Sequence, residues 1–409
     1  MPDEGDDVLG AGEGIRSSGP FSYQRPYQTE YDPDDVRLNV VAADSESLDD
    51  RATALRLTDV VAEVFVWSRS TPPQDVLRTT IQAKTAVPTR SGGFFGDSEA
   101  VIEVDLTEVV LEQLRGTPLA QLIVEAPLMR VHFDNEQFRS VNQDLVEFRS
   151  RDLRGWGRGL LGDLSTGELE FSDGADVTID VGSNLVAQIQ TPTGGTLRVV
   201  EITAPGDRRE GAKRTVQVIA REGVRATIRD DGTGDGERSE PIALDAQSLD
   251  VWLEFGGDNE RPRVLSARAD GEVHIERASD AYYGDTALFT FAPDGEPTSV
   301  VLEDEPRLEY RLVSPEGDEL NATVSGVGPL TAHFIGADEE RRLHFDFTGP
   351  GRITAIERGA DITFARRVRA VGKPGTDSVE AEIEGDVRVI GNEGSLAADR
   401  LGVTQTVDG

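Results

Sequence analysis

Two segments of the chain, residues 271–291 and 385–405, are copies of one unit, and a third, looser copy begins at Glu222. Each copy reads as a glycine turn and an alternating strand, followed by a polar turn and a second alternating strand. Such a module cannot bury its apolar face alone, so we expect the copies to stack side by side. The repeat therefore predicts an elongated scaffold rather than a compact catalytic domain. The matching positions are Gly271 with Gly385, Val273 with Val387, Ile275 with Val389, Asp285 with Asp399, Ala287 with Leu401, and Phe289 with Val403.

Apolar and polar residues also alternate elsewhere, for example along residues 60–67 and 102–106. A period of two is typical of a half-buried strand, and frequent turn residues favour an antiparallel sheet. One stretch departs from this pattern. In Thr107–Arg115 three apolar residues fall at helical spacing and Gly116 follows, which predicts a short helix. The expected fold is all-β and antiparallel, with very few helices.

The chain is strongly acidic and contains no cysteine. Its 409 residues carry a formal net charge of −35, so binding to a nucleic-acid backbone is disfavoured over most of the surface. The absence of cysteine excludes disulfides and thiolate metal sites. A length of 409 residues fits two or three ordinary domains or one extended repeat body.

Composition divides the chain into three parts. Residues 1–35 are polar and acidic and predict a disordered tail. A run without core-forming residues at 204–211 separates a β domain with a short helix, 36–203, from a β-repeat domain, 212–409. No apolar run approaches the roughly 20 residues of a membrane-spanning helix. We therefore expect any export segment or membrane anchor to lie upstream of this numbering.

Side chains for catalysis are sparse. The four histidines, His132, His274, His333 and His344, each sit in an alternating strand without a partner at metal-ligand or triad spacing. No nucleophile elbow, phosphate loop, dinucleotide fingerprint or zinc-protease motif is present. The acidic run Asp230–Glu237 could suit Ca²⁺, but its spacing is not that of an EF-hand and favours a solvated hairpin turn. The sequence thus predicts no enzyme, no cofactor and no required metal.

The apolar positions of the repeated strands allow two interpretations. They can fill a dry core, or they can line a continuous groove that holds acyl chains. The candidate groove residues are Val273, Ile275, Phe289, Phe291, Val387, Val389, Leu401 and Val403. A register slip of one residue would exchange the two faces of each strand, so the groove is a firmer expectation than its individual residues.

The repeated phrase resembles that of the lipopolysaccharide-transport bridge proteins, the periplasmic LptA/LptC (OstA-like) superfamily. Members repeat a Gly-x-Val-x-Val strand followed by an Ala-Asp-x-Leu-x-Val strand. Here Gly385-Asp-Val-Arg-Val and Ala398-Asp-Arg-Leu-Gly-Val match that phrase closely, and Gly271-Glu-Val-His-Ile matches it less closely. The likeness covers about residues 215–409, and a fainter LptC-like version covers about 36–200. The chain departs from the family in its greater length and in lacking the anchor helix of the LptC component.

The resemblance implies an antiparallel β-jellyroll, or β-taco, that forms an elongated open trough. Such a protein binds lipopolysaccharide or a related lipid in the periplasm or cell envelope and serves outer-membrane biogenesis. Its partners would be other β-jellyroll transport components, joined by stacking of edge strands. The family carries no catalytic residues to transfer.

Two other functions fit the same sequence. The first is a structural β-repeat protein of the cell surface with a dry core and no ligand. The second is a carbohydrate-active β-repeat enzyme that uses paired carboxylates. A lipid-accessible groove would separate the transport protein from the scaffold, and two carboxylates facing each other across a cleft would favour the enzyme.

Overall fold

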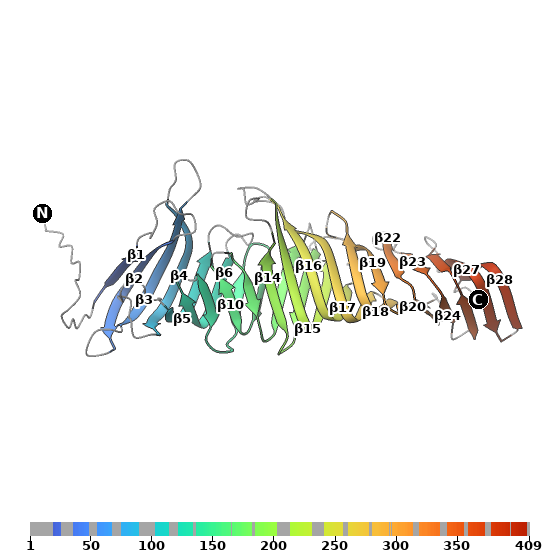
Figure 1. Ribbon diagram of the computed structural model, residues 1–409, viewed down its shortest axis with the longest axis horizontal. Coiled ribbons are helices and arrows are strands. Elements are labelled where there is room, and N and C mark those ends of the chain that lie inside the picture. The colour runs from blue at the N-terminus through green and yellow to red at the C-terminus, as the bar shows by residue number, and fades with distance from the viewer. Residues whose placement is uncertain are drawn as a thin grey trace. The chain divides into compact units, whose positions relative to one another are not determined.

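The structure is a computed structural model of the chain. It describes residues 19–25, 36–48, 55–67, 75–89, 103–113, 122–133, 136–164, 166–181, 185–202, 213–230, 241–256, 261–277, 280–293, 295, 297–313, 319–335, 342–355, 359–372, 378–392 and 394–406. These residues form 28 β-strands and no helix. Each strand pairs with its neighbours in an antiparallel manner, so the predicted all-β antiparallel class is confirmed (Figure 1).

The chain forms two compact units. The first unit contains β1 (Phe21–Arg25), β2 (Val36–Ser47), β3 (Leu55–Trp67), β4 (Asp75–Pro88), β5 (Glu103–Gln113), β6 (Leu122–His132), β7 (Gln137–Ser140), β8 (Val146–Arg149) and β10 (Leu160–Asp163).

The second unit begins with β9 (Leu153–Gly157), β11 (Leu169–Phe171), β12 (Ala175–Val181), β13 (Leu185–Thr191), β14 (Thr196–Glu201), β15 (Arg214–Asp230), β16 (Ile242–Phe255), β17 (Arg263–Arg277), β18 (Asp280–Phe291) and β19 (Pro297–Glu303). It continues with β20 (Arg307–Val313), β21 (Glu319–Gly326), β22 (Leu330–Ile335), β23 (Arg342–Thr348), β24 (Gly351–Ala355), β25 (Ala360–Phe364), β26 (Arg367–Gly372), β27 (Ser378–Gly391) and β28 (Gly394–Thr406).

The predicted helix at Thr107–Arg115 is wrong, because residues 107–113 belong to β5, which pairs with β4 and β6. Within β5, Glu108 has a left-handed backbone with φ of 48°. Burial alternates up to Leu106 and resumes one residue out of phase at Val109. The inner residues on the two sides of Glu108, Leu106 and Val109, are therefore three positions apart instead of two.

The prediction rested on Val110, Leu111 and Leu114. Val110 lies on the outer face of β5, 37% exposed, and Leu111 on the inner face, fully buried, so apolar residues on both faces of a strand imitated a helix stripe.

The corner at Glu108 is shared by neighbouring strands of the first unit. In β6 the buried positions change phase between Ala126 and Met129, and Ala126 lies opposite Val109 of β5. Because the phase changes in both strands at the same place, the apolar side chains stay on one face before and after the bend. We call this the inner face, and the parts of the sheet on either side of a corner its two limbs.

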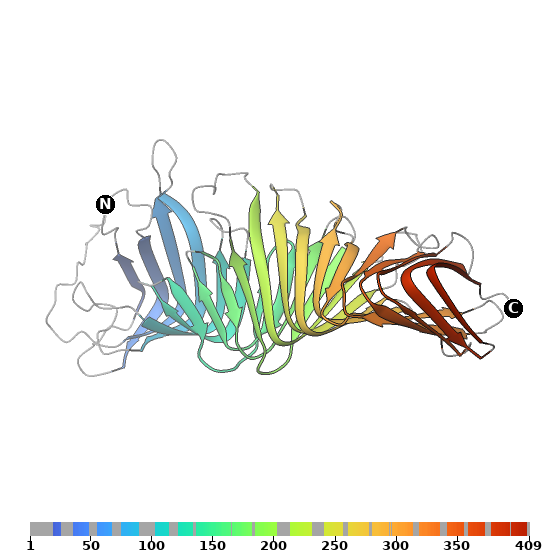
Figure 2. The same ribbon diagram turned by 45° about the vertical axis from the view of Figure 1, so that its right-hand side comes forward.

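The second unit makes its corners with β-bulges, and this corrects the expected glycine turns. Gly271 and Gly385 lie inside the continuous strands β17 and β27 and do not reverse the chain. The long strands of this unit bend along their length (Figure 2). The φ angles of Gly271 and Gly385 are 81° and 86°, and the next residue is also left-handed. Glycine suits a left-handed position in a hairpin turn and in a bulge alike, so its presence did not distinguish them. The register shifts fall at Arg221/Val224, Asp270/Val273 and Glu384/Val387.

The two compact units do not coincide with the predicted division at 204–211. Strands β13 and β14, which precede that run, both pair with β15, which follows it. The residues on both sides therefore belong to the second unit, and the units separate instead within residues 149–167. A polar run without core residues can be a loop between paired strands as readily as a linker between domains.

The expected disordered tail, residues 1–35, needs a correction at one point. Phe21–Arg25 forms β1, which pairs with β2, and Phe21 is 9% exposed. Phe21 and Tyr23, two aromatic residues at alternate positions of β1, lie opposite Ala42 and Val40 of β2. The rest of that segment, apart from Gly19 and Pro20, lies outside the described residues.

Two core tyrosines make the second unit sensitive to alkaline pH. Tyr282 and Tyr310 are 3% and 8% exposed. Burial, and secondly the charge of Asp280, raises the pKa of both phenols, and that of Tyr310 to about 12. The unfolded chain therefore loses these protons first as the pH rises above the usual tyrosine pKa of about 10.

We expect the free energy of unfolding to be maintained below pH 10 and to fall between pH 10 and pH 12, by roughly 2–3 kcal/mol for Tyr310 alone. Urea unfolding at several pH values measures this fall. It should be smaller in Tyr310→Phe. An equal slope in the wild type and Tyr310→Phe would contradict the assignment.

Candidate functional site

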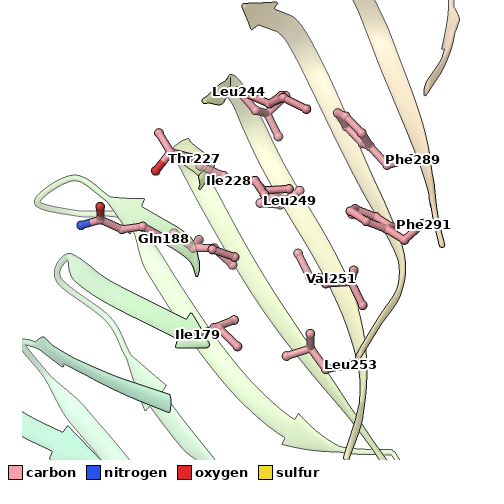
Figure 3. Close-up of a pocket in the computed structure, with 16 residues that line it drawn as sticks. Ile179, Gln188, Thr227, Ile228, Leu244, Leu249, Val251, Leu253, Phe289 and Phe291 are labelled. Atoms are coloured by element: carbon pink, nitrogen blue, oxygen red, sulfur yellow. The ribbon is translucent and has the colours of Figure 1, made fainter. Parts of the chain in front are cut away.

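An apolar pocket lies in the second unit (Figure 3). Its empty space, including the part open to solvent, is about 550 Å³. Fourteen of its sixteen lining residues are apolar, and none carries a charge. The lining residues are Ile179, Ala187, Gln188, Ile189, Ala226, Thr227, Ile228, Ile242, Leu244, Leu249, Val251, Leu253, Val264, Ala267, Phe289 and Phe291.

The pocket is built by six strands that follow one another in the sheet: β12, β13, β15, β16, β17 and β18. Directly opposite residues of an antiparallel pair share a face, so the cross-strand register places the lining side chains in rows. One row runs from Val251 through Ala267 to Phe289. Another row runs from Ile189 through Ala226 to Leu244.

The corner in β16 brings the two rows to one pocket. Leu244 and Leu249 are five positions apart, and in a regular strand they would face opposite sides of the sheet. The register with β17 shifts between Asp245 and Ser248, and the buried positions change phase there. Leu244 on one limb and Leu249 on the other therefore both point into the pocket (Figure 3). The pocket lies between two limbs of one bent sheet.

The two polar lining residues turn their side chains away. The amide of Gln188 donates to the carboxylate of Asp176 at 2.9 Å, and Figure 3 shows it pointing out of the apolar cluster. Thr227 lies on the outer face and points the same way. The pocket thus presents hydrocarbon only, with no acid, base, nucleophile or carboxylate pair among its lining residues. Its chemistry suits an apolar ligand without a charged group.

The structure separates the eight predicted groove residues. Phe289 and Phe291 line the pocket. Val273, Ile275 and Val387 do not line it, and each is at most 2% exposed, as expected for dry core. Val389, Leu401 and Val403 lie on the inner face of β27 and β28, partly exposed, and are not part of this pocket either.

The repeat pattern in the sequence did not predict most of the residues that line the pocket. Its residues Ile179 and Ile189 precede the predicted boundary at 204–211, and nothing in their local pattern connects them with Phe289. A signal did exist for β16, because the looser third copy contains Leu249 and Val251. Both residues line the pocket.

Strand β28 pairs only with β27 among the described residues. Leu396, on its inner face opposite Val389, is 53% exposed. Leu401 and Val403 are also incompletely covered. The second unit therefore has an edge of 13 residues with an apolar inner face.

The four histidines all lie in strands, as expected, but two of them face each other. His333 of β22 lies directly opposite His344 of β23. Burial, and secondly the neighbouring His333, lowers the pKa of His344 below its usual value. His274 instead stacks on Tyr283, with ring centroids 4.7 Å apart.

The described residues include no group of three or more side chains that could hold a metal ion. The acidic run Asp230–Glu237, considered for Ca²⁺, lies outside the described residues after Asp230. The described part of the chain contains no helix that is long and apolar enough to cross a membrane.

No protein-family profile and no curated protein sequence matches this chain.

Proposed function

We propose that this protein binds the acyl chains of lipopolysaccharide or a related lipid in the apolar pocket and passes the lipid between envelope components without catalysis. The observation that carries the proposal is the uncharged pocket between two limbs of a bent antiparallel sheet. A dry scaffold has no need of such a space, because protein interiors are otherwise close-packed.

The pocket favours a hydrocarbon chain over a polar ligand. Each methylene transferred from water to an apolar surface contributes about 0.8 kcal/mol. A polar ligand would lose its hydrogen bonds to water there and gain none, since the only two polar lining residues turn outward. The headgroup of a bound lipid therefore stays outside the pocket, in solvent.

Transfer between proteins would use the open end at β28. A sheet edge presents unpaired N–H and C=O groups, which a similar domain can extend by adding a strand. The apolar inner face of β28 would then continue into that of the partner. The resemblance of the repeated phrase to the lipopolysaccharide-transport bridge proteins agrees with this route and favours the periplasm or cell envelope as its location.

Site-specific photo-crosslinking tests the proposal. A benzophenone side chain at Phe289, which is 6% exposed and lines the pocket, should capture lipopolysaccharide or another lipid in a lipopolysaccharide-producing host. The same side chain at the next position, Thr290, faces the outer surface and should not. The adducts are separated by electrophoresis and identified by mass spectrometry.

Equal labelling at both positions, or lipid at neither, would contradict a lipid-binding pocket and favour the scaffold. A carbohydrate-derived adduct without acyl chains at Phe289 would favour the carbohydrate-active alternative. The benzophenone side chain at Leu288, a 38% exposed residue on the outer face, is a second control, because lipid captured there would show nonspecific contact with membranes.

A further inference from the structure

Two histidines that are 11 positions apart in the sequence face each other across a strand pair of the second unit. His333 on β22 lies directly opposite His344 on β23. The centroids of their rings are 4.7 Å apart, and the ring planes are tilted by 39°. Both side chains are partly exposed to solvent.

We propose that His333 and His344 form a two-imidazole site for a divalent transition metal ion, Cu²⁺ in preference to Ni²⁺ or Zn²⁺. Imidazole nitrogen is a good ligand for all three ions, and the affinity of a given nitrogen site peaks at Cu²⁺ in this series. Opposite positions of an antiparallel pair hold their Cβ atoms roughly 4.5–5.5 Å apart. One nitrogen of each ring can therefore reach the same ion at the usual distance of about 2.0–2.1 Å.

The surroundings leave the two rings available as ligands. The Nδ1 atom of His344 is buried and has no hydrogen-bond partner in the part of the chain that the structure describes. The nearest carboxylate on the same strand face, that of Asp346, is already held by the guanidinium of Arg367. Two protein ligands leave the remaining coordination positions of the ion to water or to an external ligand.

Other groups around the two histidines determine which kind of metal ion the site favours. Ser299 of β19 lies opposite His333, and its hydroxyl is a weak additional donor. Arg369 of β26 lies opposite Asp346, beside His344, and its positive charge opposes a cation. These neighbours disfavour hard ions such as Ca²⁺ and Mg²⁺, which need several oxygen ligands. The site should therefore select for ions that bind nitrogen.

Isothermal titration of the full chain, without a polyhistidine tag, with CuCl₂, NiCl₂ and ZnCl₂ tests the proposal. High salt should be used so that the acidic surface does not bind these cations nonspecifically. We expect one site per chain, with Cu²⁺ the tightest, and nitrogen hyperfine structure from two imidazoles in the electron paramagnetic resonance spectrum of the Cu²⁺ form. His333→Gln or His344→Gln should each weaken binding by at least about tenfold, because the second imidazole then no longer binds intramolecularly.

His274→Gln is the matched control. His274 also lies on a partly exposed strand face, but it stacks on Tyr283 and is 3.5 Å from a carboxylate oxygen of Glu276. Its replacement should leave the titration unchanged. Unaltered binding in His333→Gln and His344→Gln, or an equal loss in His274→Gln, would overturn the site. Circular dichroism of each variant separates loss of the ligand from loss of the fold.

Discussion

Filling the apolar pocket with a single phenyl ring should abolish the binding of acyl chains while the protein stays folded. Ala226 and Ala267 lie in the centres of the two lining rows, and each keeps a small exposure, 8% and 7%, inside the pocket. A phenyl ring at either position occupies space that an acyl chain would use. We expect Ala226→Phe and Ala267→Phe each to weaken binding of a fluorescent fatty acid at least about tenfold, or ~1.4 kcal/mol.

Ala243→Phe is the matched control for this experiment. Ala243 lies on β16 next to Leu244 but on the outer face, opposite Thr227 and Glu276. The Ala243→Phe substitution adds the same phenyl ring to a neighbouring strand, but on the outer face, and should leave binding of the fatty acid unchanged. Full binding in both inner variants would contradict the proposed function, provided that circular dichroism shows native strands. Equal weakening in the outer variant would show that the ligand binds elsewhere.

The Gly326→Ala substitution, which adds one methyl group, should strongly destabilise the second unit. A Cβ atom there would lie 2.4 Å from Cζ of Phe347 and 2.4 Å from the carbonyl oxygen of Pro350. Phe347 is fully buried and packs edge-on against Phe364, so its ring has no free space to move into. Overpacking of this kind costs roughly 1–3 kcal/mol, and contact with a backbone carbonyl favours the upper end of that range.

Gly402 is a glycine at which the same substitution should change the free energy of unfolding in the opposite direction. It lies in β28, and a Cβ atom there meets nothing within 4 Å. Gly402→Ala should raise the free energy of unfolding by about 0.5–1 kcal/mol, because alanine loses less backbone entropy on folding than glycine. Urea unfolding of the two variants should therefore shift in opposite directions. A stable Gly326→Ala protein would show that the ring of Phe347 is not tightly held.

The fold class was predictable because it depends on a short-range property. Alternation of apolar and polar residues, as in Val60, Ala62 and Val64, places one face of each strand in the core. The same pattern located Phe289 on the inner face and Thr290 on the outer face. The repeated phrase at 271–291 and 385–405 marked positions that the structure uses in the same way, as bulged corners of long strands.

The positions of the corners in the strands were harder to predict from the sequence. In Thr107–Arg115 apolar residues on both faces of β5 looked like a helix stripe, and at Gly271 a bulge looked like a turn. In both places the local residues permit either structure. The neighbouring strands decide between them, because a continuous ladder on both sides of Glu108 leaves no room for a helix.

The amino-acid sequence by itself determined that this chain forms antiparallel strands with one apolar face, since that follows from a period of two along each segment. Only the tertiary structure decided which of those faces meet. The pocket joins Ile179 to Phe289 through five successive strand pairings, and the histidine pair arises from the register of β22 with β23. A register can slip by one residue without altering the local pattern, yet each slip moves every side chain to the other face. Pairing between distant segments, and not the pattern within them, therefore creates both candidate sites.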